Sequence, residues 1–142
     1  MKNAPRRIDQ VGGVVVRRLG RSDYVATWHA MQDFTSARDA TTPDEIWLTE
    51  HSPIYTLGLA GRREHLLRDN GIAVIKADRG GQVTYHGLAV NVAMDLAPFS
   101  DIDPCGYPGL TVTQLCDVGP QRTVEEAGDE LAPIIALTLC SR

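Results

Sequence analysis

The sequence VGGVVVRRLGRSDYVATWHAMQDF, residues 11–34, contains a strand that is followed closely by a helix. Its first part, Val11 to Leu19, is rich in valine and predicts a strand that Gly20 ends. Ser22 or Asp23 then offers a side-chain oxygen to cap a helix. Apolar residues recur at helical spacing after this cap: Tyr24, Val25, Trp28, Met31 and Phe34.

Before this stretch, residues 1–10 are polar and predict a loose leader without the apolar core of a signal peptide. After it, four further strands are predicted: Glu45–His51, Ile54–Leu57, Ile72–Ala77 and the alternating Leu88–Asp95. A short helix is expected over residues 62–67 and a turn at residues 69–71. A last helix begins at Thr123, which forms a capping box with Glu126, and Pro133 kinks or restarts it.

The predicted strands follow one another without regular intervening helices. This order favours an α+β fold, a mixed or antiparallel sheet with packed helices, over a doubly wound fold. Residues 11–142 contain no repeat, low-complexity tract or linker, so we expect a single domain.

Composition excludes several classes of function. The 142 residues include 14 basic and 18 acidic side chains, for a formal net charge of −4, which argues against broad nucleic-acid binding. No stretch approaches the roughly 20 apolar residues of a membrane-spanning helix. Three cysteines without a CxxC pair fit the reducing cytoplasm better than a disulfide framework.

The glycine-containing stretch DRGGQVTYHG, residues 78–87, is the first candidate site. Paired glycines let backbone N–H groups converge on an oxygen, Arg79 adds a fixed charge, and three polar side chains follow. The same residues also fit a plain hairpin turn before a partly buried strand. Local physics leaves both interpretations open, and the stretch lacks the GK[ST] ending of a nucleotide-binding loop.

Cys105, in DPCGYPG (residues 103–109), is the second candidate. Pro104 and Gly106 hold its thiol on a stiff bend, which suits an exposed nucleophile. The alternative is a free cysteine that packs under a loop. The four histidines show no metal-binding spacing, so we expect no zinc site, and His86 is the histidine best placed for function. A basic cluster could meet an acidic partner or form a solvated face: Arg62, Arg63, Arg68 and Arg79.

These motifs, with three further stretches, resemble the bacterial octanoyltransferases of lipoate biosynthesis. The matching stretches are DEIWLTEH (44–51), PIYTLG (53–58), DRGGQVTYHG (78–87), GLAVNVAMDL (87–96) and DPCGYPG (103–109). The match is ordered along the chain and covers most of residues 11–140. The resemblance implies the catalytic fold of the biotin and lipoate protein ligases, in an incomplete form.

The resemblance also implies an activity. The family transfers an octanoyl group from octanoyl-acyl carrier protein to a lysine of lipoyl domains through a cysteine thioester. Partners would be the lipoyl domains of 2-oxo acid dehydrogenase complexes and the glycine cleavage H protein, with no nucleic acid or membrane. No cofactor is implied, since a thioester donor is already activated and needs no ATP. The ATP-dependent lipoate ligases, which need no cysteine nucleophile, fit less well.

The family motifs assign roles to individual residues. Cys105 would carry the acyl group as the catalytic nucleophile. The substrate-binding residues would be Arg79, Gly80, Gly81, Gln82, Val83, Thr84, Tyr85 and His86, followed by Gly87, Leu88 and Ala89 from a second segment.

The chain departs from the family pattern in the middle. In the family, a long central segment separates the RGGQVTYHG motif from a second His-Gly, whereas here His86-Gly87 serves both motifs. The family's catalytic lysine lies in that segment, and neither lysine of this chain, Lys2 or Lys76, stands in its place. We therefore expect an internal deletion at about residue 87. The alternative to an active transferase is a catalytically impaired remnant that binds acyl groups or carrier protein without turnover.

Overall fold

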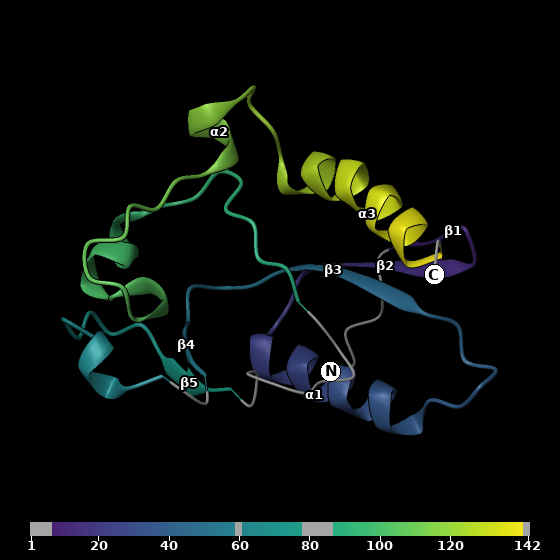
Figure 1. The fold of residues 1–142 in the computed structure, drawn as a ribbon, viewed down its shortest axis with the longest axis horizontal. Coiled ribbons are helices and arrows are strands. Elements are labelled where there is room, and N and C mark those ends of the chain that lie inside the picture. Colours follow the sequence, from purple (N-terminus) through teal and green to yellow (C-terminus); the bar gives the residue numbers. More distant parts are fainter. Residues whose placement is uncertain (1–6, 59–60, 78–86, 141–142) are drawn as a thin grey trace. The chain divides into compact units, whose positions relative to one another are not determined.

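The computed structural model describes residues 7–58, 61–77 and 87–140. Residues 78–86, which include the predicted Arg79–His86 loop, lie outside this part of the chain. The described elements are β1 (Arg7–Val11), β2 (Val14–Arg21), α1 (Tyr24–Ala37), β3 (Glu45–Glu50), β4 (Tyr55–Leu57), η1 (Arg63–His65), β5 (Val74–Lys76), η2 (Ala97–Asp101), η3 (Pro104–Gly106), α2 (Leu115–Val118) and α3 (Val124–Cys140), where η denotes a 3-10 helix (Figure 1).

The chain falls into two compact units. The first contains residues 1–52 and 123–142, and the second contains residues 53–122. The expectation of a single domain over residues 11–142 stays a prediction. Both units combine helices with short sheets that include parallel pairs, which confirms the α+β class.

A mixed three-stranded sheet with the order β1-β2-β3 forms the centre of the first unit. β1 and β2 are antiparallel and joined by Gly12 and Gly13, both at positive φ, while β2 and β3 are parallel. Residues 7–10 therefore belong to the sheet and not to a loose leader, because this two-glycine turn returns the chain onto β2. β2 also continues past Gly20 to Arg21, with an irregular register between Arg18 and Gly20.

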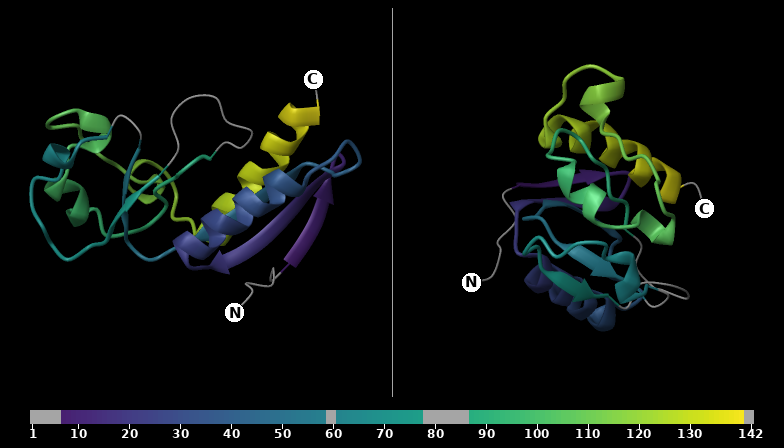
Figure 2. Two further views of the ribbon diagram at one scale, coloured as in Figure 1. Left: turned by 90° about the horizontal axis from the view of Figure 1, so that it is seen from below. Right: turned by 90° about the vertical axis from the view of Figure 1, so that its left-hand side faces the viewer.

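The helices α1 and α3 cover opposite faces of this sheet, as Figures 1 and 2 show. Successive side chains of a strand point to opposite faces. On β3, Trp47 meets Phe34 of α1 at 5.9 Å between ring centroids, whereas Leu48 contacts α3. A Cβ on Gly128 would lie 3.1 Å from Leu48 Cδ1, so glycine is what lets α3 approach β3 closely there.

The core of the first unit lies between β2 and α3. Val16, Ala132 and Ala136 are each at most 1% exposed. The three small residues Gly128, Ala132 and Ala136 stand four apart, so they share one face of α3. Pro133 does not divide the helix, which runs continuously through it.

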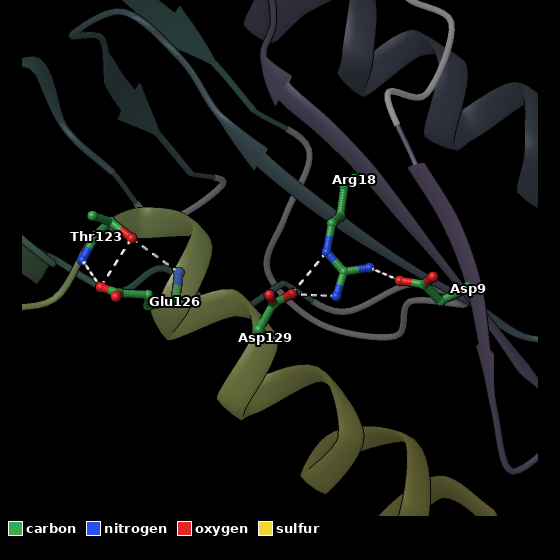
Figure 3. A network of polar contacts seen from close by, with 5 residues as sticks. All are labelled: Asp9, Arg18, Thr123, Glu126 and Asp129. Atoms are coloured by element: carbon green, nitrogen blue, oxygen red, sulfur yellow. Dashed lines mark hydrogen bonds and ion pairs between the residues drawn. The ribbon is translucent and has the colours of Figure 1, made fainter.

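Arg18 on β2 connects the neighbouring strand β1 to the helix α3. Its guanidinium group lies between the carboxylates of Asp9 on β1 and Asp129 on α3 and binds both (Figure 3). At the start of α3, Thr123 and Glu126 form the predicted capping box: the Thr123 N–H donates to Glu126 Oε2 at 2.8 Å, and the Glu126 N–H donates to Thr123 Oγ1 at 3.1 Å.

The second unit is built on the parallel pair β4-β5 and a set of turns. The predicted Asp69-Asn70-Gly71 turn is present, with Gly71 at φ 80° and its N–H bonded to Asp69 Oδ1. The strand expected over Leu88–Asp95 is not formed. Instead, the carbonyls of Asn91 and Val92 accept hydrogen bonds from Leu115 and Cys116 at the start of α2. Alternation alone favours a strand, but a strand needs a neighbour to pair with along its length.

Candidate functional site

Cys105 lies in the tight 3-10 turn η3, whose shape follows from its sequence. Pro104 begins the turn, and its ring fixes its own φ, which stiffens the backbone just before the cysteine. The Gly106 N–H then donates to the Asp103 carbonyl at 2.9 Å, and the Tyr107 N–H donates to the Pro104 carbonyl at 3.1 Å. The turn therefore projects Cys105 away from regular structure, and the residue is exposed.

The backbone of Cys105 is left-handed, with φ 55° and ψ 19°. It is the one residue other than glycine with positive φ in the described part of the chain. Such a conformation costs about 1–3 kcal/mol in a residue with a side chain and tends to occur at functional sites. This strain favours the nucleophile interpretation of Cys105 over a cysteine that merely packs under a loop.

The other two cysteines use their thiols within the fold. Cys116 Sγ accepts from the Arg122 N–H at 3.5 Å, and Cys140 Sγ donates to the Gly12 carbonyl at 2.7 Å. Within residues 7–58, 61–77 and 87–140, the Cys105 thiol makes no such hydrogen bond. Cys105 thus differs from both in backbone conformation and in the use of its sulfur.

A neighbouring segment supports the Cys105 turn. Leu66 and Ile102 form an antiparallel bridge, the Leu67 N–H donates to the Asp101 carbonyl at 2.9 Å, and the Asp103 N–H donates to the His65 carbonyl at 2.8 Å. Residues 65–68, next to η1, therefore run beside residues 101–103. Sequence reasoning did not find this support, because the contacting residues are far apart in the chain and form no motif.

Asp101 is a buried part of this support, at 9% exposure. Its Oδ2 accepts from Asn70 Nδ2 at 2.8 Å, and its Oδ1 lies 3.3 Å from Arg68 Nη1 in an ion pair. The same Asn70 amide donates to the Tyr55 hydroxyl at 2.9 Å, and that hydroxyl donates to the Pro98 carbonyl at 2.7 Å. These contacts join β4 to the loop that leads into the Cys105 turn.

The structure describes only some of the residues predicted to bind substrate. Gly87, Leu88 and Ala89 are described and exposed, Leu88 at 70%. Arg79 to His86 lie outside the described residues. The binding roles of all eleven residues, and the nearness of Cys105 to the glycine-containing stretch, stay predictions.

Metal-binding and membrane-spanning features are both absent from the described residues. No group of three or more histidine, cysteine, aspartate or glutamate side chains there is arranged to hold a metal ion. The helices in this part of the chain also lack the length and apolar character needed to cross a bilayer.

Comparison with known proteins identifies the family. Residues 23–98, more than half of the chain, match the lipoyl protein ligase A/B catalytic domain. The chain is 39% identical to the octanoyltransferase of Aromatoleum aromaticum over 83% of its own length and 82% of that protein. It is 38% identical to the octanoyltransferase of Dechloromonas aromatica and 35% identical to that of Laribacter hongkongensis. Each match covers 83% of this chain, with 93% of the first protein and 92% of the second.

These alignments also show that the chain is short. Each spans 190 positions, yet 83% of 142 residues is only about 118 residues. About 70 aligned positions of the relatives therefore have no counterpart here, which fits the missing segment that the motifs predict. With both the catalytic-domain match and the similarity to whole relatives, the chain belongs to the octanoyltransferases, acyltransferases of lipoate biosynthesis that share their catalytic domain with the lipoyl protein ligases.

Proposed function

We propose that this protein transfers an octanoyl group from octanoyl-acyl carrier protein to a lysine of lipoyl domains, with Cys105 as the acyl carrier. The single observation that carries the cysteine assignment is the strained, exposed turn at Cys105, at φ 55°, in a family of octanoyltransferases. The lipoyl domains would be those of 2-oxo acid dehydrogenase complexes and the glycine cleavage H protein. Such a reaction belongs in the cytoplasm.

The proposed reaction has two steps. The Cys105 thiolate attacks the carbonyl carbon of the donor thioester, a new C–S bond forms, and the bond to the carrier thiol breaks. The carrier leaves as a thiol, with the proton that Cys105 gave up when it formed the thiolate. The neutral lysine amine then attacks the acyl-enzyme carbonyl carbon, an amide C–N bond forms, and the bond from that carbon to the Cys105 sulfur breaks. The proton that the amine loses goes to the released Cys105 sulfur. The donor thioester supplies the activation, so the proposal needs no ATP.

Backbone amides of Gly80 and Gly81 would stabilise the negative oxygen that develops in each step. Two adjacent glycines let their N–H groups converge on one oxygen. Arg79 to His86, with Gly87 to Ala89, would then line the acyl and thioester site.

Adduct mapping tests the cysteine assignment. The full chain is incubated with octanoyl-acyl carrier protein, and octanoyl adducts are located by mass spectrometry. We expect the adduct on Cys105 alone, and we expect Cys105→Ala to abolish it. Cys116→Ala and Cys140→Ala are the matched controls and should retain it. Octanoylation of Cys116 or Cys140 with Cys105 left free would refute the assignment.

A second candidate function is supported by the roughly 70 alignment positions that the chain lacks. If the deletion lies at about residue 87, it removes the lysine that the family uses beside its cysteine. The protein would then be an impaired remnant that binds acyl groups or carrier protein without turnover. Acylation of Cys105 without transfer to a lipoyl domain would identify this remnant, whereas repeated transfer would identify the enzyme.

A further inference from the structure

Cys105 and Gly106 form two successive left-handed residues, at φ 55° and φ 75°. Glycine accepts this conformation readily, but a cysteine does so only where its surroundings hold it there. The orientation of the Cys105 thiol therefore depends on whatever fixes the backbone on either side of it.

His65 contacts that backbone on both sides. Before the cysteine, the His65 carbonyl accepts the Asp103 N–H at 2.8 Å. After the cysteine, the His65 ring lies against Gly106: a Cβ added at Gly106 would be 3.1 Å from Cε1, 3.4 Å from Nε2 and 3.5 Å from Nδ1. One residue thus holds the two ends of the turn that carries the sulfur.

His65 is itself held in place. It ends η1, and its N–H donates to the Arg62 carbonyl at 3.1 Å. The next residue, Leu66, forms the bridge to Ile102, and its N–H donates to the Arg63 carbonyl at 3.0 Å. Because these bonds fix the backbone that carries the ring, the position of this segment is transmitted to the turn through the contact with Gly106.

We propose that His65 is a positioning residue for Cys105, whose ring packs on Gly106 and keeps the thiol aimed at the acyl donor. This inference rests on the proposed function of Cys105 as the acyl carrier. In this role His65 acts through the packing of its flat ring against Gly106 and not through proton transfer.

Two substitutions test the ring contact. In His65→Ala the turn loses its support, so we expect the rate constant for acylation of Cys105 at saturating donor to fall by about tenfold to a hundredfold, with half-saturation unchanged. His65→Phe keeps a flat ring and should retain a rate close to that of the original chain. An unchanged rate in His65→Ala, or equal losses in both variants, would overturn the proposal.

Gly106 and Gly109 provide a matched pair for a second test. Both have positive φ, 75° and 74°, but a Cβ at Gly109 would meet nothing within 4 Å. Gly106→Ala and Gly109→Ala are each measured in the original chain and in combination with His65→Ala. The loss of acylation rate caused by Gly106→Ala should be several-fold smaller in the His65→Ala background than in the original chain, because the added methyl group then has no ring to meet. The loss caused by Gly109→Ala should be the same in both backgrounds. If the effects of Gly106→Ala and Gly109→Ala depended equally on His65, the proposed contact between the His65 ring and Gly106 would be contradicted.

A small reagent separates this inference from the proposed function. The alkylation rate of Cys105 by iodoacetamide, followed by peptide mapping, requires no octanoyl donor. If the original chain is not acylated at all, the proposed function fails, yet the same coupling between His65 and Gly106 in alkylation would support the positioning role. Circular dichroism of each variant, with a cooperative thermal transition, verifies that the compared chains are folded.

Discussion

Glu45 shows how a single residue can link stability to pH. Its side chain is only 4% exposed, and both carboxylate oxygens accept hydrogen bonds from Arg17, each at 2.6 Å. Trp47 Nε1 donates a third, also at 2.6 Å. Burial alone would raise the pKa of Glu45, but the hydrogen bonds from Arg17 and Trp47 outweigh it and lower the pKa below its usual value.

A carboxyl group whose pKa is lowered by folding contributes stability above its unfolded pKa of about 4.3. That contribution is lost as the pH falls through the lower pKa of the folded state. We therefore expect Glu45→Gln to reduce the free energy of unfolding at pH 7 by about 1–3 kcal/mol. When the pH falls below about 4, Glu45→Gln should lose less of its remaining stability than the original chain does, because it has no carboxylate to protonate at this position.

Urea unfolding at pH 7 and at acid pH measures both effects. Glu50→Gln, at an exposed position on the same strand, is the control and should change the free energy of unfolding by less than about 0.5 kcal/mol. Parallel pH dependence in Glu45→Gln and the original chain would contradict the role of Glu45.

The turn at Cys105 could be predicted from the sequence, but the residue that supports it could not. The flanking Pro104 and Gly106 already indicated a stiff bend, and the structure has that bend. His65 gave no signal, because its contact with Gly106 depends on how two distant segments pair. Local sequence thus predicted the turn, and only the tertiary structure showed what supports it.

At the scale of elements, the contribution of the N-terminal cap of α3 to stability can be measured separately. The reciprocal bonds between Thr123 and Glu126 satisfy backbone N–H groups that have no partner within the helix. Thr123→Ala removes this cap, so we expect it to lower the free energy of unfolding by about 1 kcal/mol.

Thr138→Ala, in the same helix, is the control for that measurement. The Thr138 hydroxyl donates to the Ile134 carbonyl at 2.8 Å, a bond inside the helix that adds little to its stability. Alanine also has the higher helix propensity, so this variant should be neutral or slightly more stable. Equal losses in the two threonine variants would mean that the cap contributes nothing specific.

The accuracy of the element predictions follows from how local their causes are. α1 begins after Asp23, whose side chain accepts from the Ala26 N–H at 2.8 Å, and β3 begins at the predicted Glu45. Both depend on signals within a few residues. The strand predicted over Leu88–Asp95 failed because its pattern gave no information on a pairing neighbour, and residues 7–10 were missed because their pairing with β2 is not local.

At the scale of the whole molecule, the chain lacks roughly 70 positions that the aligned relatives have. The described residues nevertheless retain a mixed sheet covered by helices on both faces, and a supported turn at Cys105. Of the predicted site, only the Cys105 turn and residues 87–89 lie in the described part of the chain. The roles of Arg79 to His86, and the expected absence of a lysine that could activate Cys105, stay predictions. The ability of Cys105 to accept an acyl group can therefore be tested separately from the activation of its thiol.

We expect the 142-residue chain to transfer octanoate about 10²–10⁴-fold more slowly than a version with a family-like central segment inserted at Gly87. A positioned acid–base group typically contributes this factor to the rate. The measurement is turnover to a lipoyl domain. The matched control carries the same insert with alanine in place of its lysine and should stay slow.

Each outcome of that comparison bears on a particular residue. If the original chain equals the version with the insert, the lysine argument is wrong, and His86 or Lys76 must supply the proton transfer. If His86, at the end of the glycine-containing stretch, is that group, then His86→Gln would abolish turnover, whereas unchanged turnover in His86→Gln would leave Lys76. If turnover is slow while Cys105 still accepts the octanoyl group, the nucleophile is intact, and the deletion has removed only the group that activates it.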